Sequence, residues 1–157
     1  MAKHNNDVNK PEDAIELLRA DHDKVRNLFA QYEAANDRQT KRELAEEAFV
    51  ELEIHSQLEE NVFYPALEEE TDEEGKKLLA ESLKEHQMVT NLIQELRKLD
   101  PDDQMFDAKF HELMENVEHH VEEEENDMFP KAEEQLEGEM EELVEEMQEL
   151  KQQLLAS

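Results

Sequence analysis

The chain has 157 residues, of which 45 are acidic and 16 are basic, so its formal net charge at pH 7 is −29. This length is typical of one domain, and this acidity disfavours nucleic acid and anionic membrane surfaces as partners. The sequence has 2 Gly, 4 Pro, no Trp and no Cys, which argues against a β-rich fold and excludes disulfides and thiolate metal sites. We therefore predict an all-α protein in which nitrogen and oxygen atoms hold any metal.

Residues 1–10 are polar and lack the apolar segment of a signal peptide, so we expect a disordered tail and a cytoplasmic protein. After them, apolar residues recur every three to four positions in four stretches, as they do along one face of a helix. The second and fourth helices are expected to stop at Pro65 and Pro130, and the third to stop before Pro101. The four apolar faces are Ile15, Leu18, Val25, Phe29 and Tyr32; Leu44, Ala48, Leu52, Leu58 and Val62; Leu79, Leu83, Val89, Ile93 and Leu96; and Phe106, Phe110, Leu113, Val117, Val121 and Met128.

Four helices with short connections predict an up-down-up-down four-helix bundle over residues 11–132. A further amphipathic helix is expected within residues 133–157, where Met140, Met147 and Leu154 follow a heptad-like spacing. This C-terminal helix can cap the bundle, pair with a second copy of the chain or fray. The sequence therefore leaves a monomer and a homodimer open.

The chain repeats a pattern of chemically active residues in its two halves. A lone His in the first half has a counterpart in the second half, and so does a His followed four and five residues later by Glu-Glu. Two helical hairpins with the same pattern predict a bundle with pseudo-twofold symmetry. The matching residues are His22, His55, Glu59 and Glu60 in the first half and His86, His120, Glu124 and Glu125 in the second.

Six of these polar residues interrupt the apolar faces of the predicted helices. Each paired His and Glu are four residues apart and therefore share one face of their helix. Counted from the helix ends at about 1.5 Å per residue, the four His fall in one layer roughly 13–15 Å from one end of the bundle. The sequence thus predicts that six inward side chains meet: His22, His55, Glu59, His86, His120 and Glu124.

Unpaired carboxylates in an apolar interior cost many kcal/mol, and a metal cation removes that cost. Six protein ligands exceed what one tetrahedral zinc ion accepts. Two metal ions, each with two His ligands and both Glu as bridges, would use every group. A mixed imidazole and carboxylate set suits iron, or manganese, better than calcium or magnesium.

The order of these residues resembles that of the hemerythrin-like (HHE cation-binding) proteins over about residues 12–132. The resemblance rests on the lone His, His-x3-Glu-Glu, lone His, His-x3-Glu-Glu order, with Phe-Tyr-Pro and Met-Phe-Pro following. It implies a non-haem di-iron centre in which Glu59 and Glu124 bridge the irons beside an oxo or hydroxo group. It also implies His22 and His55 as terminal ligands of one iron, and His86 and His120 as those of the other.

Two departures from the family pattern bear on function. Oxygen-carrying hemerythrins have a His where Thr90 stands, four residues after His86, and an Asp where Glu124 stands. The resemblance is therefore stronger to the reactive and sensing branches of the family, and reversible oxygen carriage is weakened. The leading hypothesis is a protein that binds or reacts with O2, NO or peroxide. The alternative is an iron-binding, sensing or storage module whose metal occupancy controls folding and partner binding.

The remaining His and Tyr residues have simpler interpretations. His111 and His119 belong to Glu-rich, solvated faces and His4 to the N-terminal tail, so none of them is expected to bind metal. Tyr32 and Tyr64 are expected to pack in the core, although a buried phenol close to the centre can support the ligands.

Overall fold

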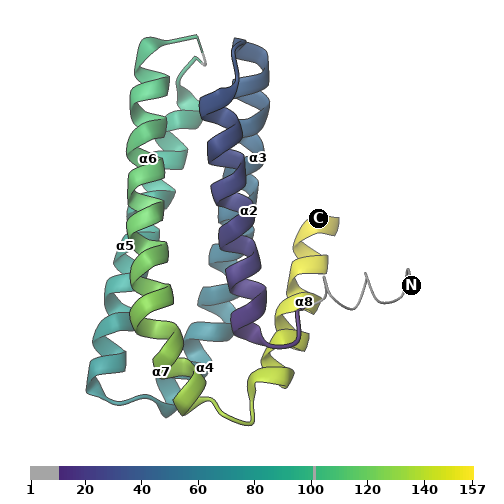
Figure 1. The fold of residues 1–157 in the computed structure, drawn as a ribbon, viewed down its shortest axis with the longest axis vertical. Helices are drawn as coiled ribbons and strands as arrows, with labels where there is room; N and C mark the ends of the chain where they lie inside the picture. Colours follow the sequence, from purple (N-terminus) through teal and green to yellow (C-terminus); the bar gives the residue numbers. More distant parts are fainter. Residues whose placement is uncertain (1–10, 101) are drawn as a thin grey trace.

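A computed structural model describes residues 11–100 and 102–157, so the predicted N-terminal tail lies outside the described residues. The predicted all-α bundle is confirmed, because four long antiparallel helices run side by side (Figure 1). These helices are α2 (Ala14–Ala34), α3 (Arg38–Leu58), α5 (Glu73–Lys98) and α6 (Gln104–Glu123).

An aspartate begins each of the four long helices. The Asp13, Asp37, Asp72 and Asp103 side chains each accept a hydrogen bond from a backbone N–H two or three residues further along. Each cap satisfies a donor that would otherwise lack a partner in the first helical turn, and it places a negative charge at the positive end of the helix dipole. The helix starts are therefore fixed by local side chains as well as by packing.

The expected stops at Pro65 and Pro130 are wrong, because both helices continue past these prolines. A π-helical turn, η1 (Glu59–Phe63), joins α3 to α4 (Tyr64–Glu70). A second, η2 (Glu124–Met128), joins α6 to α7 (Phe129–Gln135). A proline ring collides with the carbonyl four residues earlier in a regular α-helix. At the end of each π turn, the N–H group of Tyr64 or Phe129 bonds to the carbonyl five residues earlier instead of four. The backbone before each proline is therefore wound more widely than in an α-helix, and the helix continues past the proline.

The core of the bundle consists of two apolar clusters. One contains residues such as Leu18, Leu58 and Leu79, and the other contains residues such as Val25 and Val89. On each helix the polar residues predicted to converge lie between members of the two clusters, so a polar layer separates them. Leu83 was expected on the apolar face of its helix, but its side chain is 45% exposed. Ser82, one position earlier on α5, is buried instead.

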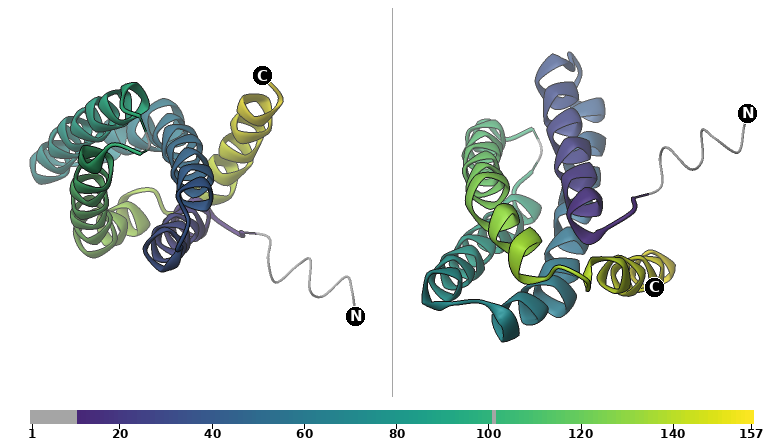
Figure 2. Two further views of the ribbon diagram at one scale, coloured as in Figure 1. Left: turned by 90° about the horizontal axis from the view of Figure 1, so that it is seen from above. Right: turned by 60° about the horizontal axis from the view of Figure 1, so that its bottom comes forward.

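The C-terminal helix α8 (Met140–Ala156) lies outside the four-helix bundle, beside α2, α3 and η1 (Figures 1 and 2). Its buried residues Leu143, Val144 and Met147 join the apolar cluster that contains Leu18 and Leu58. This helix therefore caps one side of the bundle. Where the bundle domain ends along the chain stays a prediction. Among the described residues, no helix combines the length and the apolar character needed to cross a membrane.

Candidate metal centre

The structure brings all six predicted residues together inside the bundle. The side chains come from every long helix and from the first residue of each π turn, and each residue is at most 6% exposed. The two inner carboxylates are the most deeply buried, at 0% for Glu59 and 1% for Glu124. The converging residues are His22, His55, Glu59, His86, His120 and Glu124.

The four imidazole rings form two pairs, one from each hairpin. The ring centres of His22 and His55 are 4.8 Å apart, and those of His86 and His120 are also 4.8 Å apart. The first pair, together with Glu59 and Glu124, presents four ligand atoms within 4.8 Å of one another. The second pair, together with Glu59, presents a smaller group of three ligand atoms. Glu59 is therefore shared between two adjacent sets of potential metal ligands.

Both carboxylates reach both pairs of histidines. Glu59 Oε1 lies 2.9 Å from His86 Nε2 and 3.4 Å from His55 Nε2. Glu124 places Oε1 3.0 Å from His22 Nε2 and Oε2 3.5 Å from His120 Nε2. Each carboxylate thus lies between ligands from the two hairpins, which is the position a bridging ligand requires.

Every histidine of the centre also bonds to a second carboxylate through its outer nitrogen. The Nδ1–H groups of His22 and His86 donate to Glu125 and Glu60, at 2.8 and 2.6 Å. Those of His55 and His120 donate to Asp21 and Glu85, at 2.9 and 2.7 Å. A carboxylate on Nδ1 fixes the ring orientation and leaves the Nε2 lone pair free to face inward. All four rings are therefore arranged as metal ligands usually are.

Sequence reasoning missed these four outer carboxylates as part of the centre. Their signal lies in the repeat, because Asp21 and Glu85 directly precede the lone histidines. Glu60 and Glu125 directly follow the inner glutamates. Each acid is the sequence neighbour of one inner ligand and the hydrogen-bond partner of a different one, so the repeat that identifies the ligands also identifies these partners.

Inward-facing atoms of this centre lack hydrogen-bond partners. In the described part of the chain, six buried side-chain polar atoms have no partner at hydrogen-bonding geometry, and four of them belong to this centre. A buried polar atom without a partner costs about 1–3 kcal/mol. A cation placed among these atoms would satisfy all four, so the donor set fits a metal. The four atoms are His22 Nε2, His55 Nε2, Glu59 Oε2 and Glu124 Oε1.

The two inner carboxyl groups differ in their affinity for protons. Burial and the negative charge of Glu59 raise the pKa of Glu124 above its ordinary value. Burial also acts to raise the pKa of Glu59, but His55 and the hydrogen bond from Glu124 outweigh it and hold that pKa well below the usual range. Two like charges this close in a buried site do not both ionise readily. In the metal-free protein, Glu124 therefore holds a proton more readily than Glu59.

Tyr64 is a further residue of the centre. Its hydroxyl group donates to Glu124 Oε2 at 2.5 Å and lies 3.2 Å from Glu59 Oε1. Burial and the charges of Glu124 and Glu59 raise the pKa of Tyr64 well above its ordinary value, so the phenol keeps its proton. Tyr64 is buried as expected for a core residue, but its hydroxyl group contacts both inner carboxylates. Tyr32 is also buried and bonds to Asp107, outside the centre.

Three histidines of the centre hold protons strongly in the metal-free protein. Burial acts to lower the pKa of each, but the neighbouring carboxylates outweigh burial. The net effect raises the pKa of His120 to about 10 and also raises those of His55 and His86. A metal ion that binds at Nε2 must displace such a proton, so metal binding and proton release are coupled.

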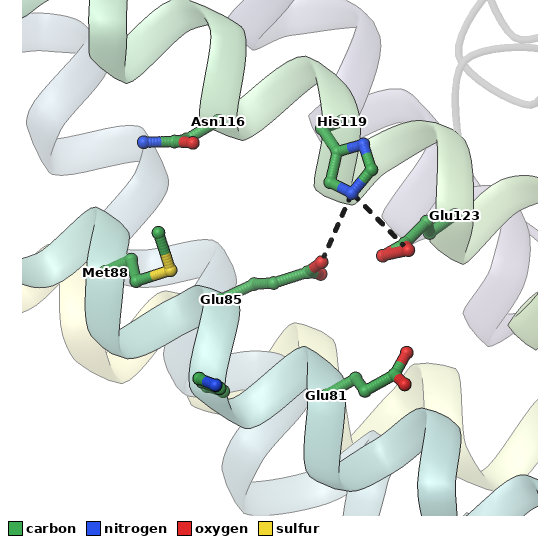
Figure 3. Close-up of a pocket in the computed structure, with 7 residues that line it drawn as sticks. Glu81, Glu85, Met88, Asn116, His119 and Glu123 are labelled. Atoms are coloured by element: carbon green, nitrogen blue, oxygen red, sulfur yellow. Dashed lines mark ion pairs between the residues drawn. The ribbon is translucent and has the colours of Figure 1, made fainter.

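A surface groove of about 370 Å³ is lined in part by Glu85, the partner of His120, together with His119 and Glu123 (Figure 3). In it, His119 Nε2 lies 3.7 Å from Glu85 and 3.5 Å from Glu123. The His119 side chain is 67% exposed, so water competes for these groups. His111 is also on the surface and is 57% exposed. Both residues thus lie outside the buried cluster, and Glu85 links the groove to the centre because it also bonds to His120.

Comparisons with known proteins agree with the fold and with the nature of the centre. Residues 13–132 match the sequence profile of the hemerythrin HHE cation binding domain. A solved structure of a hemerythrin HHE cation binding domain-containing protein from Mycobacterium kansasii superposes with a TM-score of 0.77. The two chains are 29% identical, and the match covers 90% of this chain and 86% of that one.

Two curated proteins are also similar in sequence. A hemerythrin-like protein of Schizosaccharomyces pombe is 32% identical over 116 residues, which cover 74% of this chain and 57% of that protein. A protein of Nostoc named DNA nickase is 27% identical over 114 residues, which cover 73% of this chain and 32% of that protein. The chain therefore matches about half the length of the first relative and a third of the second.

Proposed function

The chain belongs to the hemerythrin HHE cation-binding domain family, and on this premise we propose that its buried centre binds two iron ions. With iron bound, the protein would bind or react with a small molecule such as O2, NO or peroxide. The observation that carries the proposal is the convergence of four buried ligand atoms, none of which has a partner at hydrogen-bonding geometry although His22 Nε2 and Glu124 Oε1 lie 3.0 Å apart. Each of these atoms faces the centre of the cluster and belongs to a residue type that binds iron.

The composition of the donor set supports two ions of a transition metal. Six inward side chains exceed the four ligands of a tetrahedral zinc site. Calcium and magnesium prefer oxygen ligands throughout, whereas four of the six donors here are imidazoles. Iron, or manganese, accepts this mixture. One ion would bind to His22 and His55 and the other to His86 and His120, with Glu59 and Glu124 as shared ligands.

A small cavity beside the four histidines limits what the centre can admit. Its volume is about 20 Å³, close to the space that one water molecule occupies. Apart from the histidines, Asp21 and Ser56, it is lined by apolar side chains that keep water out of the centre. A diatomic molecule or peroxide is close to this size, and larger substrates are not. The apolar lining residues are Val25, Leu52, Val89, Val117 and Val121.

The protein supplies orientation and proton binding around the metals, while the iron ions when bound would supply redox chemistry and a coordination position for the small molecule. The outer carboxylates hold the imidazole rings so that each Nε2 faces inward. Tyr64 holds a proton on Oη, 2.5 Å from Glu124. That hydroxyl group contacts both shared carboxylates, and it is positioned to donate to an oxygen of either one.

Metal analysis of the full chain, combined with absorption spectra before and after reduction, tests the proposal. We expect two iron ions per chain and an absorption band that disappears on reduction. Addition of O2, NO or hydrogen peroxide to the reduced protein should then change the spectrum rapidly. Iron uptake that stabilises the fold without any such reaction would favour an iron-sensing or storage role instead. Purified protein that never takes up iron would contradict the proposal.

A further inference from the structure

The two halves of the metal centre have the same kinds of ligand but different surroundings. Each half has two histidines with outer carboxylates, and both inner carboxylates reach both halves. The pseudo-twofold symmetry of the sequence thus extends to the ligands and to their hydrogen-bond partners. It does not extend to the positive charges around them.

Positive side chains accompany only the His22–His55 half. Lys151 Nζ donates to Asp21 Oδ1 at 3.0 Å, and Asp21 is the partner of His55. Arg26 Nη1 lies 3.7 Å from Glu125, the partner of His22. On the other half, the partner Glu85 contacts a His instead, with His119 Nε2 at 3.7 Å. Within residues 11–100 and 102–157, no Lys or Arg nitrogen lies within 4 Å of the carboxylates of Glu60 or Glu85.

Lys151 reaches the centre because of the way α8 packs. The apolar face of α8 contacts α2, α3 and η1, which belong to the first hairpin and its π turn. Lys151 follows the fully buried Met147 by four residues, so it lies on the same face one turn further along. Its partner Asp21 is 4% exposed and the Lys151 side chain is 29% exposed, so water screens this ion pair only in part. Among the residues that the structure describes, no helix packs against the second hairpin as α8 packs against the first.

A cation beside an outer carboxylate weakens the metal ligand on its other side. A carboxylate that accepts a hydrogen bond from a metal-bound imidazole increases the basicity of that imidazole. Lys151 draws negative charge on Asp21 away from His55, and its own charge repels a cation bound nearby. Both effects act most strongly on the nearer His22–His55 half, so they reduce its affinity for a metal ion more than that of the other half.

We propose that α8, through Lys151, lowers the metal affinity of the His22–His55 half, so that the His86–His120 half fills first. This inference rests on the proposed function, since it requires that the centre bind two ions. Lys151 acts as a positioning residue, because it contacts Asp21 and not the metal. The C-terminal helix, which lies beyond the residues matched by the family profile, thereby makes a symmetric centre unequal.

Titration of the metal-free full chain with Co²⁺ tests this inference. Calorimetry would give the two affinities, and NMR of the histidine side chains would show which rings bind the first ion. We expect the resonances of His86 and His120 to change before those of His22 and His55. In Lys151→Met, which removes the charge and keeps most of the side-chain length, the weaker site should bind about tenfold more tightly.

Two further variants control for structural effects. Lys151→Arg keeps the charge and should restore the wild-type difference between the sites. Lys131→Met removes a similar ion pair, 3.1 Å from Asp72 on the surface, and should leave both affinities unchanged. In the metal-free protein, the His55 Nδ1–H resonance should shift in Lys151→Met and not in Lys131→Met, which tests the contact without any metal.

Different results would overturn the two proposals. A wild-type chain that binds no metal would refute the proposed function and this inference with it. A chain that binds two ions with equal affinity, or one in which Lys151→Met leaves the weaker site unchanged or weakens it further, would refute only the role of Lys151. The same holds if Lys151→Arg behaves like Lys151→Met.

Discussion

Replacement of Tyr64 by Phe removes one hydroxyl group from the buried centre and keeps the aromatic ring. In the metal-free protein that hydroxyl group donates to Glu124 at 2.5 Å and lies 3.2 Å from Glu59. Tyr64 is 3% exposed and both carboxylates are at most 1% exposed, so water cannot readily replace the lost donor. We therefore expect Tyr64→Phe to destabilise the metal-free protein.

The size of this effect follows from the kind of hydrogen bond that is lost. A hydrogen bond to a charged group contributes about 1.5–3 kcal/mol, and a buried acceptor without a partner has a similar cost. We expect the free energy of unfolding of the metal-free protein to fall by about 2 kcal/mol. Urea denaturation in the presence of a chelator, followed by circular dichroism, would measure this as a lower midpoint at an unchanged m-value.

Tyr32→Phe provides a matched control at the other end of the same bundle. Tyr32 also donates to a carboxylate, that of Asp107, but the Asp107 side chain is 34% exposed and keeps Arg38 as a partner at 3.1 Å. Water and Arg38 can compensate there, so we expect a loss below about 1 kcal/mol. Equal losses in the two variants, or a larger loss in Tyr32→Phe, would refute the reasoning that burial of the carboxylate pair sets the cost.

Three further predictions concern metal content, pH and the cavity. Glu59→Ala should lower the content of both metals together in elemental analysis, because Glu59 is shared between both sets of ligands; loss of one metal alone would contradict a bridging role. The pKa of His120 is raised to about 10 from an ordinary 6.5, so the folded metal-free protein holds the His120 proton more tightly than the unfolded chain does. The resulting contribution to the free energy of unfolding is complete below pH 6.5 and should be lost as the pH rises toward 10. Metal affinity, measured by competition with a chelator, should rise over the same pH range because fewer protons must be displaced, and a pH-independent affinity would argue against it. Val25→Leu adds a methylene group to the cavity wall, so azide binding to the iron-loaded protein should weaken about tenfold while the iron content stays at the wild-type value.

The fold could be predicted from the sequence because its determinants are periodic or local. Apolar residues at helical spacing predicted the four long helices. The prolines misled the prediction at Pro65 and Pro130, since a proline inside a helical pattern usually ends the helix. Here each proline follows a π turn whose hydrogen bonds span five residues. Nothing in the local sequence separates a proline that ends a helix from one that follows such a turn.

The inner residues of the centre were easier to identify than their partners. His55 and His120 interrupt apolar faces, so the sequence pattern itself predicts that their imidazole rings face inward. Asp21 and Glu85 stand among many other acids of a chain with 45 acidic residues, and only the structure shows that they accept hydrogen bonds from these histidines. Lys151 could not be predicted at all, because its contact with Asp21 depends on where α8 packs.

The charges of the whole centre support the proposal that it binds two metal ions rather than one. Six carboxyl groups surround the four histidines, namely Glu59 and Glu124 inside and Asp21, Glu60, Glu85 and Glu125 outside. With neutral histidines, a single divalent ion and the charge of Lys151 would leave about half of this negative charge unbalanced in a largely buried site, and protons would have to make up the difference. Two divalent ions with Lys151 balance nearly all of it, and Arg26 lies 3.7 Å from Glu125. The raised pKa values of His55, His86 and His120 in the metal-free protein have the same origin. Without metal ions, protons on these histidines balance part of the negative charge of the carboxylates.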